Sequence, residues 1–473
     1  MKHPHQPCTS ILLIFLVVSA LLAEGTLRFI HGDSSNTALI NIVMLAEAYP
    51  ENREQKFIDD VNKITADVLM SPPYKQYACF FNIWSIFVPS ADSGIDHPDK
   101  GIEKDTYFNA TFSTTTPQLV TFNNRMAAYD LLAEHVPDYD MVSLIVNDVT
   151  YGGSGGAIAV ITLGGNSKEI FLHETGHSFT LLGDEYESSY TLKPAEKYNI
   201  TAKTNREEIP WRSWILPETP VPTPETTSYQ DIVGLFEGAM YQTKDWYRPK
   251  YLCKMRTLGT PFCEVCTEAH VVQFYSHISP IKESFPQKLV INYPEDTTTL
   301  SVSTYDLNPN TITVTWYLDN RELLAGEVLS LDKFSLKSGK YKVMALARDT
   351  TPLARNPLAK AIMSDSVSWD LNIENTDIKQ NRSLFTKAKI SVKLRSGMVT
   401  FNGIPENTRP LQLSVYTMQG KCIVNRKSFE PQHPNVGVSI PETKLGTGLY
   451  IITVKELTSK SRRYFRVFAN VIP

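Results

Sequence analysis

The most informative segment of the chain reads Phe171-Leu-His-Glu-Thr-Gly-His-Ser-Phe-Thr-Leu-Leu-Gly-Asp-Glu-Tyr186. It contains His173-Glu174-x-x-His177, in which two histidines lie four residues apart. Four residues are just over one helical turn, so on a helix both imidazoles project from one side and can bind the same metal ion. Three protein ligands and one open position for water are typical of catalytic Zn²⁺. The motif therefore predicts one catalytic zinc ion.

The remaining parts of such a site can be assigned to nearby residues. Glu174 follows the first histidine and is placed to take a proton from the attacking water. Gly183 predicts the end of the helix, and Asp184 directly after it can turn back as the third ligand. The residues around the motif are mostly apolar, so the two imidazoles lie in or beside a core. Unpartnered, they would be costly to bury there, and a metal ion removes that cost.

Composition and the N-terminus restrict the function further. The net charge is −4 and 20% of the residues are charged, which leaves no basic patch for nucleic acid. Residues 1–25 read as a secretory signal peptide, because Lys2 precedes an apolar run over residues 11–22 that small residues follow. That run is too short for a membrane span, and no other segment is long and apolar enough. The mature chain is expected to be secreted or at the cell surface.

The segment before the motif predicts an α/β (α+β) architecture. Apolar runs of strand length alternate with amphipathic helices, which indicates a sheet covered by helices. The predicted elements are strands over 38–48, 80–88 and 141–146 and helices over 51–70 and 121–134.

A glycine-rich segment, Tyr151-Gly-Gly-Ser-Gly-Gly156, separates this pattern from the motif. It lacks the Lys-Ser/Thr pair of a phosphate loop, which argues against nucleotide binding. Two interpretations stay open. The segment is either a flexible turn or a backbone along which an extended peptide approaches an edge strand above the zinc.

The chain after residue 278 has a different texture. Alternating segments such as 311–318 and 341–346, with the turn residues Asp319-Asn320 between them, are typical of antiparallel sheets. We expect a catalytic domain over residues 26–278, followed by two β-sandwich domains over 279–373 and 374–473. Further strands of the last unit are predicted over 389–394, 411–416 and 450–454.

Five cysteines remain after the signal peptide, so they cannot all pair within one chain. Three of them are close in sequence: Cys253, Cys263 and Cys266. In a secreted chain, this cluster favours a disulfide from Cys253 to one of the other two over a structural zinc site. Which of the two pairs forms stays open.

The motifs in this order resemble the IgA-peptidase-type family of bacterial zinc metallopeptidases. The matching segments are His173–His177 with Gly183-Asp-Glu-Tyr186, Tyr151–Gly156, Ser93-Gly-Ile-Asp-His-Pro98, Gly234-Leu-Phe-Glu-Gly238, Cys253-Lys-Met-Arg256 and Phe262-Cys-Glu-Val-Cys266. The resemblance covers about residues 36–277. It implies a metzincin-like catalytic domain.

The resemblance also implies roles for single residues. His173, His177 and Asp184 would hold one Zn²⁺, and Glu174 would be the general base. Met255 would lie in a tight turn beneath the metal. The commoner metzincin pattern has Gly three and His six residues after the second ligand histidine, whereas this chain has Thr180 and Gly183. Glu185 therefore stays an alternative to Asp184.

The last two units carry resemblances of their own. Residues 279–373 resemble an Ig-like module. Residues 411–454 resemble the C-terminal sorting domain of the type IX secretion pathway, which would make the secretion machinery a partner. The final Ala469-Asn-Val-Ile-Pro473 departs from the usual basic ending of that domain.

These features together predict a secreted zinc-dependent endopeptidase that acts on extracellular proteins or peptides. Tyr186, Tyr241, Tyr247 and Arg248 are candidates, by residue type, for stabilising the oxyanion. Two alternatives stay open. One is a secreted binding or adhesion protein that uses its β-sandwich domains on an inactive peptidase fold. The other is hydrolysis of a non-peptide amide by the same groups.

Overall fold

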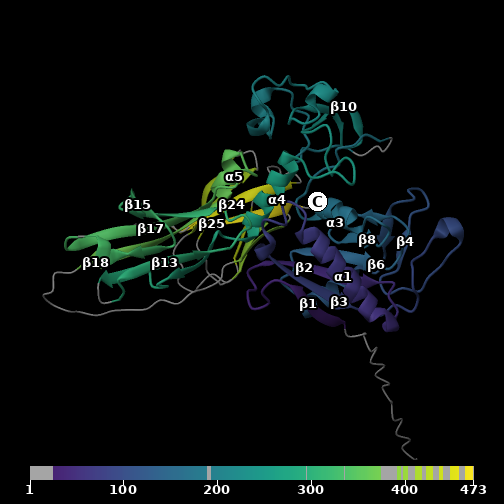
Figure 1. The fold of residues 1–473 in the computed structure, drawn as a ribbon, viewed down its shortest axis with the longest axis horizontal. Coiled ribbons are helices and arrows are strands. Elements are labelled where there is room, and N and C mark those ends of the chain that lie inside the picture. The colour runs from purple at the N-terminus through teal and green to yellow at the C-terminus, as the bar shows by residue number, and fades with distance from the viewer. Residues whose placement is uncertain are drawn as a thin grey trace, which may run out of the picture.

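The structure is a computed structural model that describes residues 25–188, 193–293, 296–334 and 336–373 and seven strands between residues 391 and 471 (Figure 1). Residues 1–24 of the predicted signal peptide lie outside the described residues. Several sheets combine with a few helices, so the predicted α+β class is confirmed. In the described part of the chain, no helix has the length and apolar character needed to cross a membrane.

A six-stranded sheet lies at the centre of the N-terminal half. Its order is β1 (Thr26–His31), β3 (Phe81–Phe87), β2 (Ile40–Glu47), β6 (Met141–Val146), β8 (Ala159–Thr162) and β7 (Gly153–Ser154). The four inner strands pair in parallel, and β1 and β7 run antiparallel at the two edges. The strands predicted over 38–48, 80–88 and 141–146 are confirmed to within two residues.

Both faces of this sheet are covered, which explains why its strands are so apolar. All of β2 is buried, and its side chains alternate between two cores. Ile42 and Met44 belong to one core, and Val43 and Leu45 to the other. The first face is covered by α1 (Glu54–Leu69) and α3 (Ser167–Ser178), and the second by α2 (Arg125–His135) and the hairpin β4 (Ala110–Phe112) with β5 (Val120–Phe122).

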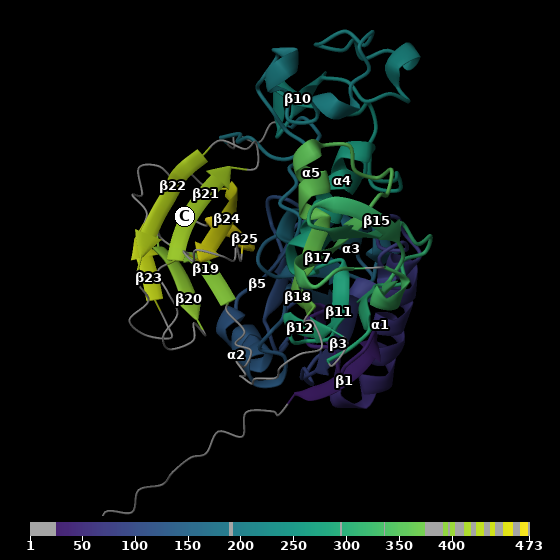
Figure 2. The same cartoon turned by 90° about the vertical axis from the view of Figure 1, so that its left-hand side faces the viewer.

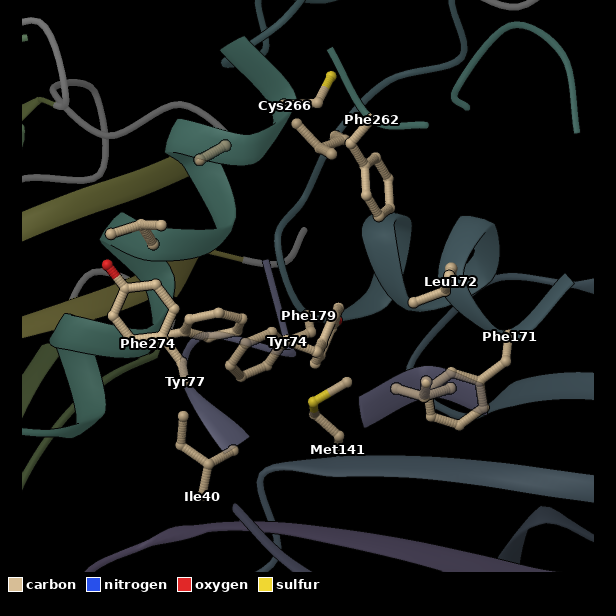
Figure 3. Close-up of a cluster of buried hydrophobic side chains, with 14 of the residues drawn as sticks. Ile40, Tyr74, Tyr77, Met141, Phe171, Leu172, Phe179, Phe262, Cys266 and Phe274 are labelled. Atoms are coloured by element: carbon tan, nitrogen blue, oxygen red, sulfur yellow. The ribbon is translucent and has the colours of Figure 1, made fainter. Parts of the chain in front are cut away.

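Helix α4 (Glu264–His277) is buried along most of its length and completes the first core. Phe274 on this helix packs edge to face against Tyr74, with 5.3 Å between the ring centroids, and it also stacks on Phe179 at 6.2 Å. Figure 3 shows these rings between α4 and the residues that follow α3. The aromatic contacts fix α4 against the end of α3.

Two further sheets follow α4 and share one core. The first consists of β11 (Ile281–Phe285), β13 (Thr299–Thr304) and β16 (Val328–Ser330). The second consists of β12 (Val290–Tyr293), β18 (Ser364–Ile373), β17 (Gly339–Asp349), β14 (Ile312–Leu318) and β15 (Arg321–Ala325). The predicted turn is confirmed, because Asp319 and Asn320 take φ of 47° and 68° between β14 and β15. The Ig-like identity of this unit stays a prediction.

Buried polar contacts join this unit to α4. The side chain of Glu268 on α4 accepts hydrogen bonds from the backbone N–H groups of Arg355 and Asn356, at 2.8 and 2.6 Å. These residues directly precede the short helix α5 (Pro357–Ile362), which packs against α4. The predicted boundary at residue 278 stays a prediction, and the segments on its two sides share these contacts.

A second such contact can be tested by substitution. Tyr77 donates its hydroxyl to Asp349 at 2.7 Å in a buried position, and Tyr275 donates to the same carboxylate at 2.9 Å. Tyr77→Phe is expected to lower the free energy of unfolding by about 1–2 kcal/mol in denaturant titration, because one buried hydrogen bond is lost. The matched control is Tyr293→Phe, whose bond to Asp332 is exposed. A Tyr77→Phe variant as stable as that control would contradict the contact.

The C-terminal strands form two antiparallel sheets (Figure 2). One contains β19 (Ser391–Arg395), β20 (Met398–Asn402) and β23 (Val436–Ser439). The other contains β22 (Cys422–Phe429), β21 (Leu411–Thr417), β24 (Gly448–Glu456) and β25 (Tyr464–Val471). The β-rich character of the last unit is confirmed, while its resemblance to a sorting domain stays a prediction.

Candidate metal centre and active site

Helix α3 carries the whole HExxH motif, as predicted, but it ends earlier than expected. Its last residue is Ser178, whereas the sequence predicted a stop at Gly183. Leu181 takes the left-handed conformation, with φ of 60°, that glycine usually adopts at a helix end. The chain therefore turns before Gly183, so the position of this glycine does not mark the end of the helix.

Gly183 has a different role in this turn. The side-chain amide of Asn199 accepts from the Gly183 N–H at 2.8 Å and donates to the Gly183 carbonyl at 2.9 Å. A Cβ at position 183 would lie 2.6 Å from the side chain of Ile200. Glycine is thus required for close packing, and the paired amide holds the backbone immediately before Asp184.

The structure brings His173, His177 and Asp184 together. The two histidine Nε2 atoms are 3.2 Å apart, and they lie 3.3 and 3.2 Å from Asp184 Oδ1. Ligands at about 2.0–2.1 Å from a tetrahedral ion are about 3.3 Å from one another. The three atoms therefore form a triangle of the size that a zinc ion requires.

Backbone carbonyls orient both imidazoles toward the centre of this triangle. His173 Nδ1 lies 3.0 Å from the carbonyl of Lys254, and His177 Nδ1 lies 2.9 Å from the carbonyl of Leu182. A carbonyl can only accept, so both Nδ1 atoms carry a proton, and Nε2 of each ring is the atom left to face a metal ion. This tautomer is the one that metal binding needs.

The electrostatics of the triangle also call for a cation. Burial opposes ionisation of Asp184, but the two histidines outweigh it and hold the pKa of that carboxyl well below its usual value. Burial likewise disfavours a charged His177, yet the Asp184 carboxylate raises the pKa of this imidazole to about 9. Among the described residues, no donor hydrogen-bonds the buried Asp184 Oδ1. The donor set fits a metal ion, whose binding would displace the proton.

Glu174 lies half-buried beside the triangle and close to the glycine-rich segment. Burial raises the pKa of Glu174, and the charge of Asp184 adds to this while the two histidines oppose it. A Cβ at Gly155 would lie 3.0 Å from Glu174 Oε2 and 3.1 Å from His177 Cβ. This glycine therefore lets the loop approach the site itself.

The edge strand β7 is only partly open to a peptide. Its Gly153 N–H donates to the carbonyl of Gln118 at 3.0 Å, so the neighbouring segment already covers that position. Of the two interpretations of the glycine-rich segment, close approach is supported at Gly155, where the neighbours are site residues. A peptide substrate along this edge stays a prediction.

Met255 lies beneath the motif, where the resemblance placed it. Its side chain is fully buried, and its sulfur would be 3.0 Å from a Cβ added to Gly176, between the two histidines of α3. The Met255 carbonyl accepts from the Glu185 N–H at 2.8 Å. The turn containing Met255 therefore supports both the helix and the segment that carries Asp184.

The second oxygen of Asp184 accepts a hydrogen bond from Tyr241. Tyr241 lies at the turn between β9 (Phe236–Ala239) and β10 (Gln242–Arg248), and its ring packs edge to face with Tyr186 at 5.4 Å. Arg248, in contrast, is fully buried and donates to the carbonyls of Glu237 and Gly238. Of the four predicted oxyanion candidates, the two named tyrosines lie at the site, and Arg248 is engaged elsewhere.

Tyr241 is therefore expected to position the third ligand. Tyr241→Phe should weaken metal binding by about 10–100-fold, the usual cost of losing an outer hydrogen bond to a ligand. Competition with a chromophoric chelator measures this affinity. Tyr247→Phe on the same hairpin is the matched control, and equal affinities in the two variants would contradict the positioning role.

The disulfide that the sequence favoured is not formed. Cys253, Cys263 and Cys266 are all free thiols, with 3.6 Å between the sulfurs of Cys253 and Cys266. Glu185 points toward this cluster and not toward the histidines, because its Oε1 accepts from Cys266 Sγ at 3.1 Å and from Asn199 at 2.8 Å. The geometry thus favours Asp184 over Glu185 as the third ligand.

Comparison with known proteins adds independent information. Residues 30–230 and 225–274 match the model of the family described as IgA Peptidase M64. A search of curated proteins finds no match.

Similar solved structures include a β-glucuronidase from Parabacteroides merdae, at 9% identity, TM-score 0.15 and coverage of 48% of this chain and 28% of that chain. A tri-modular endo-β-1,4-glucanase from Bacillus licheniformis has 10% identity, TM-score 0.17 and coverage of 44% and 41%. A chimeric titin tandem has 13% identity, TM-score 0.15 and coverage of 37% and 89%. This chain thus spans less than half of either enzyme, and at such TM-scores these likenesses carry no argument.

Proposed function

The chain belongs to the IgA Peptidase M64 family of metallopeptidases, and from this we propose that it is a zinc-dependent endopeptidase acting on extracellular proteins or peptides. The observation that carries the proposal is the triangle of acceptor atoms on His173, His177 and Asp184, with the carboxylate of Glu174 beside it. These residues would hold the zinc ion. When bound, zinc supplies a Lewis acid that polarises a carbonyl and acidifies water.

Glu174 is proposed as the general base. Its carboxylate accepts the proton of the attacking water and then delivers it to the leaving amine. The direction of its pKa suits this double role, because burial raises the pKa of Glu174 above the usual value for a glutamate. A carboxylate whose pKa lies closer to the working pH is a stronger base toward water, and its protonated form can still donate to the amine.

Tyr186 is proposed as the donor to the oxyanion. Burial and the charges of Asp184 and Glu174 raise the pKa of its hydroxyl, so the group stays protonated and can donate. Tyr241 donates its hydroxyl to Asp184 and so holds the third ligand. We assign the oxyanion to Tyr186, whose ring packs against Tyr241 at 5.4 Å.

Fold identity and export are further parts of the proposal. A metzincin-like fold is supported by the parallel sheet with its antiparallel edge strand β7, by the HExxH helix and by the Met255 turn. Export is supported by the signal-peptide pattern of residues 1–25. Sorting by a type IX pathway is supported by the sequence pattern over residues 411–454 alone.

The proposal is tested by chelation. Casein hydrolysis by the purified chain is expected to fall to background in a zinc chelator and to return when Zn²⁺ is added, while Ca²⁺ or Mg²⁺ alone does not restore it. The reason is that two imidazoles and one carboxylate suit zinc better than a hard cation. Hydrolysis that continues at full rate in chelator would contradict the proposal.

A further inference from the structure

We propose that Glu185, Cys253, Cys263 and Cys266 form a second metal site, which binds one thiophilic divalent ion such as Zn²⁺ in a structural role. The four residues come from three segments, namely the chain after α3, the Met255 turn and the N-terminus of α4. One ligand atom from each residue can be chosen so that all lie within 4.8 Å of one another. This site goes beyond the proposed peptidase activity and does not depend on it.

The spacing of the ligand atoms fits a closed tetrahedral site. The sulfurs of Cys253 and Cys266 are 3.6 Å apart. Two thiolates at about 2.3 Å from one zinc ion are about 3.8 Å apart, whereas a disulfide needs about 2.05 Å. Glu185 Oε1 lies 3.1 Å from the Cys266 sulfur and completes the group on its fourth side.

Burial supplies the second argument. The four side chains are at most 5% exposed, and Glu185 is fully buried. Its Oε2 accepts no hydrogen bond from any described residue. A buried carboxylate with a free oxygen beside three thiols is costly unless a cation shares the site. A metal ion would remove that cost.

The local backbone also favours the thiolate form. The Cys263 N–H points at the Cys253 sulfur at 3.3 Å, and the Cys266 N–H points at the Cys263 sulfur at 3.5 Å. Cys263 is the N-cap of α4, whose free N–H groups and dipole stabilise negative charge at that end. Thiolates, not thiols, are the form that binds metal.

A disulfide would use these residues less completely. It joins two sulfurs and leaves the third cysteine outside the bond and Glu185 Oε2 without a hydrogen-bond donor among the described residues, whichever pair forms. A four-ligand site engages all of them and leaves no position open for water, which is typical of a structural zinc.

The second site lies where it can stabilise the segments that support the first site. Glu185 directly follows the ligand Asp184, and Cys253 lies two residues before Met255. An ion at the second site would thus tie together the two segments that support the first site and fix both to α4. Loss of this ion should lower the melting temperature and loosen the triangle of His173, His177 and Asp184.

Cobalt substitution tests the proposal without relying on activity. The full chain, stripped of metal under reducing conditions, is loaded with Co²⁺ alone. We expect two equivalents per chain and a sulfur-to-cobalt charge-transfer band in the near ultraviolet. His177→Ala should bind one equivalent less and keep the band, whereas Cys266→Ser should lower the intensity of the band, because one of the three thiolates is lost. Cys79→Ser is the matched control, because this half-buried thiol lies outside the cluster.

The wild-type spectrum keeps the test valid even where Cys266→Ser does not fold. Glu185→Gln provides a milder variant. It is expected to keep the band but to release Co²⁺ to a chelator about tenfold faster than the wild type. The proposal would be overturned by a wild-type chain that shows no charge-transfer band. It would also be overturned if thiol alkylation and mass spectrometry of the unreduced protein found a disulfide within the cluster. A failed peptidase assay would not affect either result.

Discussion

Glu174→Gln is expected to lower kcat/KM for peptide hydrolysis by at least about 10²-fold while the protein keeps its full metal content. The amide has nearly the same shape as the carboxylate, so the metal ligands are undisturbed, but it cannot take a proton from water. Because Glu174 is half-buried beside the triangle, bulk water cannot easily take the proton in its place. Rates on a quenched fluorescent peptide and metal content by atomic spectroscopy measure the two quantities.

The control for this variant is Glu134→Gln, an exposed glutamate on α2. It should match the wild type in both measurements. A Glu174→Gln variant that cleaves as fast as this control would exclude Glu174 as the general base. Loss of metal together with activity would show that Glu174 also supports the ligands.

Asp184→Ala is expected to remove one equivalent of metal and to reduce cleavage to background. Asp184 Oδ1 lies 3.2–3.3 Å from Nε2 of both histidines, so its loss leaves two ligands. The loss of a residue that only hydrogen-bonds a ligand weakens metal binding by about 10–100-fold. The loss of Asp184 should lower the affinity for zinc by more than that. Equilibrium dialysis against zinc measures the stoichiometry. Asp99→Asn, an exposed carboxylate, is the matched control.

The same measurement separates Asp184 from its neighbour. Glu185 lies in the cysteine cluster, so Glu185→Gln should leave the histidine site able to bind zinc. The assignment of the third ligand would be reversed by two results together. Asp184→Ala would keep its full metal content, and Glu185→Gln would lose the metal ion at the histidines.

The core of the site could be predicted because local spacing controls it. Two histidines four residues apart meet on any helix, and the surrounding apolar residues predict a position beside a core. Asp184 could be predicted for the same reason, since it follows the motif closely. The end of α3 could not be predicted from the sequence. Leu181 adopts a left-handed conformation there, which side chains disfavour and which only the surrounding packing stabilises.

The supporting contacts could not be predicted, because distant segments make them. The carbonyl of Lys254 and the hydroxyl of Tyr241 reach residues 81 and 57 positions away in sequence. Backbone carbonyls leave no signal in a sequence. The sequence predicted a disulfide in the cysteine cluster for a similar reason, because Glu185, which contacts Cys266, lies 81 positions away from it in sequence.

The central claim is that this chain hydrolyses internal peptide bonds, and a peptide-library digest followed by mass spectrometry tests it most directly. The zinc-loaded full chain is predicted to produce new termini inside the peptides, and a chelator is predicted to prevent all of them. A chain that binds zinc at His173, His177 and Asp184 and yet leaves every peptide intact would contradict the claim. That result would instead favour the binding-protein or non-peptide amide alternatives.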